Sequence, residues 1–125
     1  MSQPIQIDGV DFVTIFVGDF AAASEFYETT LGLPCSVRYG GVPGAEFETG
    51  NLTLQVIEAA AIGREFIPSG HPIALHVDDV QAARNALEES GVTFHGATVD
   101  SGICHMAIFS DPDGNALMFH HRYAP

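Results

Sequence analysis

The chain has 125 residues, 46% of them hydrophobic, which fits one globular domain that buries its own core. Sixteen acidic residues face four arginines, giving a formal net charge of −12, so the surface repels nucleic acid and anionic membranes and attracts cationic small molecules. No apolar run approaches the roughly 20 residues that span a bilayer. Because the N-terminus lacks the pattern of a signal peptide, we expect a cytoplasmic protein with Cys35 and Cys104 as reduced thiols.

The first half of the chain predicts a strand, a helix and three further strands. A β-type run at 10–17 precedes Asp19, whose carboxylate can accept hydrogen bonds from the free amides of a helix's first turn. That helix carries an apolar stripe and ends at Gly32, a residue that tolerates the left-handed conformation. The stripe consists of Phe20, Ala23, Tyr27 and Leu31. The further strands are expected at 35–40, 45–49 and 51–58.

The second half repeats this order after a linker at 59–70. A strand at 72–77 leads to Asp79, which stands in the same capping position before a second helix. The stripe of this helix consists of Val80, Ala83 and Leu87, and Gly91 follows at its end. The turn sequence DPDGN separates the last two strands. Strands are expected at 92–99, 103–109 and 116–121.

Short motifs indicate an internal duplication. FVGDF at 16–20 returns as HVDDV at 76–80, at the same place before each helix. We therefore predict one α+β domain that spans residues 1–125 and contains two βαβββ modules, at about 10–58 and 71–122. Each helix is expected to cover one face of its module's sheet, and the other faces are expected to curl together into a cup.

Alternation along the strands assigns side chains to the two faces of each sheet. Val13, Ile15 and Val17 point to the first helix, and Leu117 and Phe119 point to the second. The opposite positions line the cup with apolar side chains and a few polar ones, the usual composition of a small-molecule pocket. These candidate ligand-binding residues are Phe12, Thr14, Phe16, Gln55, His76, Cys104, Met106, Met118 and His120.

Three segments carry a resemblance to a known family: FVGDFAAASEFYETTLGLP, IALHVDDVQAARNALEESGV and FSDPDGNALMF. They are similar to the vicinal oxygen chelate superfamily, which contains glyoxalases, bleomycin-resistance proteins and extradiol dioxygenases, and the likeness runs from about Val10 to His121. It implies the glyoxalase/bleomycin resistance/dioxygenase-like fold. It also implies a homodimer, because in the bleomycin-resistance branch the ligand pockets form between subunits.

Enzymes of this superfamily hold a divalent metal with His or Glu at four strand positions. The resemblance matches these positions to Phe12, Gln55, Pro72 and Met118. Glu58 would replace Gln55 after a register shift, and His71 would approach through a bulge beside Pro72. Phe and Pro have no donor atom, and neutral Gln and Met offer no charge to a hard dication. We therefore expect no metal at these positions and no other cofactor.

Three functions are compatible with this pattern. The favoured one is metal-independent binding and sequestration of a small aromatic or cationic ligand, which the likeness to bleomycin-resistance proteins extends to antibiotic resistance. The second is a lyase or isomerase of the glyoxalase type, with relocated zinc ligands His76, Cys104 and His120 or with metal-free histidine acid–base chemistry. The third is a dimeric structural module whose cup is filled by side chains. The pattern leans away from an enzyme without deciding the point.

Overall fold

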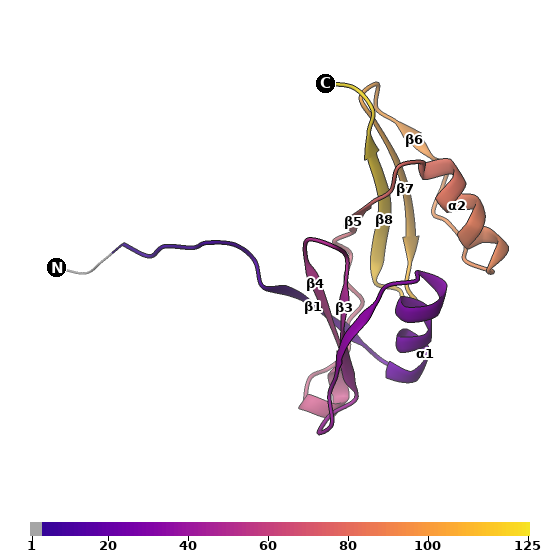
Figure 1. Ribbon diagram of the computed structural model, residues 1–125. Coiled ribbons are helices and arrows are strands. Elements are labelled where there is room, and N and C mark those ends of the chain that lie inside the picture. Colours follow the sequence, from indigo (N-terminus) through magenta and orange to yellow (C-terminus); the bar gives the residue numbers. More distant parts are fainter. Residues whose placement is uncertain (1–3) are drawn as a thin grey trace.

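The computed structural model describes residues 4–125 and contains two four-stranded sheets (Figure 1). In the first sheet β1 runs parallel to β4, and β4, β3 and β2 are joined by antiparallel pairing. From one edge to the other this sheet contains β1 (Phe12–Val17), β4 (Thr53–Glu58), β3 (Gly44–Glu48) and β2 (Cys35–Arg38). We call these strands and their helix the first module.

The second sheet has the same order and the same mixture of parallel and antiparallel pairs. Here β5 runs parallel to β8, and β8, β7 and β6 pair antiparallel. The strands are β5 (Ile73–His76), β8 (Ala116–Arg122), β7 (Cys104–Ser110) and β6 (Val99–Asp100). Two βαβββ-like modules therefore make up an α+β fold of the glyoxalase-like type, as predicted.

Each helix begins where its aspartate stands. The Asp19 carboxylate accepts a hydrogen bond from the amide of Ala22 at the start of α1 (Phe20–Glu25), and Asp79 does the same for α2 (Val80–Glu89). Figure 1 shows both helices on the same side of the two sheets. Within residues 4–125, no helix has the length and hydrophobicity needed to cross a membrane.

The first helix changes its pitch halfway along. It continues from α1 as η1 (Phe26–Thr30), a π-helical stretch in which the amide of Leu31 donates to the carbonyl of Phe26 over 2.8 Å. The wider turn presents two neighbouring side chains, Phe26 and Tyr27, to the core, where both are buried. Gly32 then takes a positive φ of 72° and ends the helix, as expected.

Two expected elements differ from the structure. The prediction of a strand at 92–99 was wrong: in that range the structure has an isolated bridge between Phe94 and Phe109 and the first residue of β6, and Gly96 turns the chain between them with a φ of 80°. Phe94 is buried there while its neighbour His95 is exposed. The predicted linker contains a short 3-10 helix, η2 (Ala59–Ile62).

The core is built from the strand positions that were predicted to face the helices. The ring of Phe26 from the first module lies 6.4 Å from that of Phe109 in the second, measured between centroids, so the two modules share one core. Its fully buried strand residues include Val17, Leu54, Val56, Ala107, Phe109 and Leu117. Alternation therefore identified the buried side of both sheets.

A buried carboxylate ties the modules together at the DPDGN turn. Asp111 accepts hydrogen bonds from the Tyr27 hydroxyl and the Asn115 side-chain amide, each over 2.8 Å, and from the backbone amides of Asp113 and Asn115. Burial and the Asp111 carboxylate raise the pKa of Tyr27, so its hydroxyl stays protonated and donates. Asn115 also donates to the backbone carbonyl of Phe16 over 2.9 Å and thereby reaches β1.

Residues 4–11 form an extended segment that projects from the body of the molecule (Figure 1). Within residues 4–125 its large apolar side chains are left uncovered: Ile5 is 89% exposed, Ile7 82% and Val10 66%. Such a concentration of exposed apolar side chains on one extended segment is typical of a contact surface.

Replacing Asp111 with Asn keeps the volume of the side chain but turns one acceptor oxygen into a donor group facing other donors. Buried polar groups left without partners cost about 1–3 kcal/mol each, so we expect D111N to lower the free energy of unfolding by about 3 kcal/mol. Urea denaturation measures this difference. Asp8→Asn, on the exposed N-terminal segment, is the control and is expected to leave stability unchanged; equal stability of both variants would contradict the role of Asp111.

Candidate functional site

Each sheet leaves one face uncovered by its helix. On the first sheet the strand register aligns Phe12 with Thr53, Thr14 with Gln55, and Gln55 with Glu46. This open face therefore combines two aromatic rings with polar and acidic side chains. We call it the aromatic–acidic face; it consists of Phe12, Thr14, Phe16, Glu46, Glu48, Thr53, Gln55 and Ile57.

A chain of hydrogen bonds crosses the aromatic–acidic face. The Thr14 hydroxyl donates to the Gln55 side-chain oxygen over 2.7 Å, and the Gln55 nitrogen donates to the Tyr39 hydroxyl over 3.0 Å. That hydroxyl in turn donates to the Glu46 carboxylate. The Tyr39 ring lies over Gly44, where an added Cβ would come within 2.7 Å of it. Glycine at this position thus allows the ring to lie flat on the sheet.

A second carboxylate on this face is held in its charged form. The hydroxyls of Ser36 and Thr53 both donate to Glu48. These hydrogen bonds hold the pKa of Glu48 below its usual range, because they stabilise the ionised carboxylate. The face therefore carries fixed negative charge at neutral pH.

One of the aromatic rings already faces a cation. The guanidinium carbon of Arg64 lies 4.7 Å from the centroid of the Phe16 ring, within the range of a cation–π contact. Arg64 comes from the segment after η2 and is exposed. The Phe16 ring is thus oriented so that a positive group can lie against it.

The open face of the second sheet has a different chemistry. Met106 is aligned with His120 on the neighbouring strand, and His120 with His76 on the next. This thioether–imidazole face consists of Ala74, His76, Cys104, Met106, Ile108, Met118 and His120. The predicted site residues are therefore divided between two sheets, four on the first and five on the second.

The residues at the family's metal positions do not fit a metal ion. Gln55 uses both ends of its amide in the network with Thr14 and Tyr39. No register shift brings Glu58 to the open face: its carboxylate lies on the helix side and accepts a hydrogen bond from the amide of Phe20. Phe12 and Pro72 have no donor atom. The donor set at these positions is therefore too poor for zinc, iron or manganese.

In the described part of the chain, the structure does not group the three zinc ligands suggested by the sequence, His76, Cys104 and His120. His76 belongs instead to a different group. His76 Nε2 lies 3.2 Å from Asp78 Oδ1, and the His76 ring lies next to that of His121, with centroids 5.8 Å apart. Among residues 4–125, this is the one group of three His, Cys, Asp or Glu side chains close enough to share an ion. Cys104 and His120 do not belong to it.

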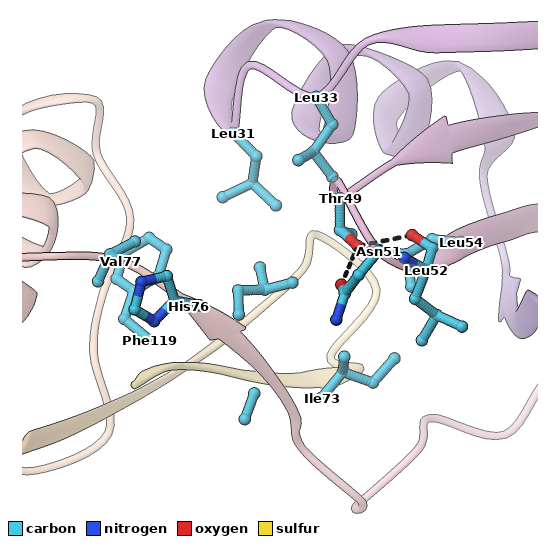
Figure 2. Close-up of a pocket in the computed structure, with 12 residues that line it drawn as sticks. Leu31, Leu33, Thr49, Asn51, Leu52, Leu54, Ile73, His76, Val77 and Phe119 are labelled. Atoms are coloured by element: carbon cyan, nitrogen blue, oxygen red, sulfur yellow. Dashed lines mark hydrogen bonds between the residues drawn. The ribbon is translucent and has the colours of Figure 1, made fainter. Parts of the chain in front are cut away.

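Cavities lie where the modules meet, and two of them include predicted site residues. The one in Figure 2 has a volume of about 360 Å³ and opens between β5 and the loops that flank the first sheet. Its apolar lining includes Leu31, Leu33, Leu52, Ile73, Leu75 and Phe119. The other, of about 420 Å³, is lined by Thr14 and Phe16 of β1 and by His71 and Pro72. Of the predicted site residues, His76 reaches the first cavity, and Thr14 and Phe16 reach the second.

Sequence reasoning missed the acidic half of the aromatic–acidic face. Glu46 and Glu48 belong to the segment AEFET, which was expected to be a strand but was not assigned to faces. Its alternation was the available signal: Ala45 and Phe47 are buried, so the glutamates lie on the open side. Tyr39 follows the end of β2 and had no comparable signal.

Comparison with known proteins agrees with this architecture. The chain belongs to the glyoxalase/bleomycin resistance protein/dioxygenase superfamily, whose sequence model matches residues 9–119. It is similar in structure to TnmS3, an antibiotic-binding protein from Streptomyces sp. CB03234, with a TM-score of 0.79 and 25% identity, covering 95% of this chain and 99% of that one.

Two further relatives cover most of the chain. A member of the same superfamily from Sphaerobacter thermophilus DSM 20745 has a TM-score of 0.79 and 26% identity, covering 91% of this chain and 97% of that one. The uncharacterized protein YraH of Bacillus subtilis (strain 168) is 27% identical over 117 residues, which is 84% of this chain and 91% of that protein. The likeness thus extends over both modules.

The hydrogen bonds of the aromatic–acidic face depend on pH, because the Tyr39 hydroxyl that donates to Glu46 can ionise. Burial and the Glu46 carboxylate raise the pKa of Tyr39 above its ordinary value of about 10. The stability that depends on the protonated hydroxyl is therefore present below about pH 10 and is lost as the pH rises through the raised pKa. The tyrosinate absorbance of the wild type minus that of Tyr39→Phe is expected to show a midpoint above pH 10.

Two variants test the cause of this shift. Glu46→Gln is expected to lower the Tyr39 midpoint, because it removes the neighbouring negative charge. Glu25→Gln, on the exposed side of α1, is the matched control and is expected to leave the midpoint in place. A midpoint that does not move in Glu46→Gln would mean that Tyr39 and Glu46 are not in contact.

Proposed function

We propose that the chain binds a small planar cation on its open sheet faces and sequesters it without chemical change. The observation that carries this proposal is the presence of two phenylalanine rings and two carboxylates on one open face. Phe12 and Phe16 offer π-faces for stacking and cation–π attraction. Glu46 and Glu48 place negative charge beside the rings, which favours cations over neutral or anionic molecules of the same shape.

The overall charge and the second face support the same ligand class. A net charge of −12 raises the local concentration of cations around the whole molecule. Met106 and Met118 offer flexible, polarisable thioethers that adapt to ligands of different outline. Burial of apolar ligand surface against such side chains contributes roughly 25 cal/mol per Å², before the costs of association.

The relative TnmS3 supports a binding role. That protein is an antibiotic-binding protein, and an aromatic antibiotic with a positive charge matches the aromatic–acidic face of this chain. Binding without catalysis is further supported by the absence of donor atoms at Phe12 and Pro72, two of the family's metal positions. Both cysteines are free thiols, in keeping with a protein that acts in the reducing cytoplasm.

A homodimer is part of this proposal. β1 and β5 are edge strands, and no hydrogen-bonded pairing joins the two sheets within residues 4–125. Open edges of this kind attract other strands. The apolar side chains of the extended segment at 4–11 are not covered by the described part of their own chain and would find cover on a second copy. In such a dimer, residues of both chains would line one ligand site.

Phenylalanine variants test the binding proposal, with the planar cation 9-aminoacridine as the fluorescent probe. Loss of a stacking ring is worth about 1–2 kcal/mol, so Phe12→Ala and Phe16→Ala are each expected to weaken binding about 5- to 30-fold. His105→Ala, on the other face of the second sheet, is the control and is expected to keep the wild-type affinity. Glu48→Gln is expected to weaken binding and to reduce its dependence on salt.

Two results would contradict the binding proposal. The first is the absence of stabilisation in a thermal-shift screen of the wild type against 9-aminoacridine and planar cationic antibiotics. The second is an equal loss of affinity in Phe12→Ala, Phe16→Ala and His105→Ala, which would show that the aromatic–acidic face is not the site.

The dimer is tested through the extended segment. A variant with Ile5, Ile7 and Val10 all replaced by serine is expected to shift from twice the chain mass of 13.3 kDa toward the monomer, measured by size-exclusion chromatography with light scattering. Ile62→Ser, which changes a 42% exposed side chain elsewhere, is the control and is expected to remain dimeric. A wild type that elutes as a monomer would refute the dimer.

A further inference from the structure

A cluster of metal-ligating side chains lies at the end of β5, away from the family's metal positions. His76 Nε2 and Asp78 Oδ1 are 3.2 Å apart. His121 comes from β8 on the neighbouring strand, and one ligand atom from each of the three residues lies within 4.8 Å of the others. Pro72 stands just before β5 and His76 ends it, so this cluster is separated from the family's metal position by the length of that strand.

The third member of the cluster lacks a partner. Nδ1 of His121 is buried and has no hydrogen-bond partner within residues 4–125. Buried imidazole nitrogens are normally paired, because an unpaired polar atom has lost its contact with water without replacement. This unpaired nitrogen belongs to the imidazole ring that lies beside His76 and Asp78 in a group close enough to share one ion.

We propose that His76, Asp78 and His121 bind a divalent transition-metal ion, with Zn²⁺ as the expected occupant. Two imidazole nitrogens and one carboxylate oxygen are donors that zinc accepts, and three protein ligands leave a fourth position for water. His76 and Asp78 are exposed, with side chains 69% and 97% accessible, so they can rotate by the small amount that closing around an ion requires. The charge of −12 favours any cation at this surface.

The site is independent of the proposed ligand binding. Two of its three residues, Asp78 and His121, are not among the predicted ligand-binding residues, and it uses neither ring of the aromatic–acidic face. Loss of 9-aminoacridine binding would leave this proposal standing, and loss of metal binding would leave the other standing.

Titration of the metal-free full chain tests the site. The protein is treated with EDTA, dialysed, and titrated with Co²⁺, whose visible absorption reports low-symmetry coordination, and with Zn²⁺ by calorimetry. We expect one equivalent per chain. His76→Ala and His121→Ala are each expected to weaken Zn²⁺ binding at least about 10-fold, because even the loss of a residue that only orients a metal ligand weakens binding by about that factor.

Matched histidine variants make the test decisive. His71→Ala and His95→Ala remove exposed imidazoles outside the cluster and are expected to keep the wild-type affinity and cobalt spectrum. His76→Ala changes an exposed side chain and therefore decides the outcome even where His121→Ala fails to fold. Wild-type affinity in His76→Ala, or an equal loss in His71→Ala, would overturn the proposal, as would the absence of Co²⁺ and Zn²⁺ binding in the wild type.

Discussion

The hydrogen bonds to the buried Asp111 carboxylate hold the two modules in their relative position. One carboxylate binds the Tyr27 hydroxyl of the first module and the amides of its own turn, and Asn115 extends the network to the Phe16 carbonyl on β1. A buried carboxylate is tolerated only where donors surround it, so the turn and the first helix must meet in one geometry. The direction in which each open sheet face points follows from this connection.

Much of the fold could be predicted because alternation and capping act locally. The aspartates before each helix, the buried positions of the strands and the duplicated order are all properties of a few neighbouring residues. The π-helical stretch after Glu25 and the loss of a strand around Gly96 depend on distant packing. Phe94 packs in the shared core next to Phe109 and Phe119, and the pattern of neighbouring residues does not indicate these long-range contacts.

The candidate site, like the fold, could be predicted where local alternation decides the structure and not where contacts between distant segments decide it. The open positions of β1 and β4 followed from the alternation of side chains along a strand, so the four predicted residues of the aromatic–acidic face share one sheet face. The contact of Tyr39 with Glu46 depends on how the chain leaves β2. The contact of His76 with His121 joins side chains that the strand register assigns to opposite faces. Strand periodicity assigns a face to a residue but does not identify the neighbour that its side chain reaches.

The spacing of the two phenylalanines along β1 sets a length scale for recognition. Phe12 and Phe16 lie four residues apart on a strand with Thr14 between them, which separates them by about 13 Å. A single ring can cover only one of them, whereas an elongated polycyclic molecule can touch both and pass over the Thr14 hydroxyl. A ligand of the class proposed above would therefore be selected by its length as well as by its charge, because only an elongated molecule would reach both rings.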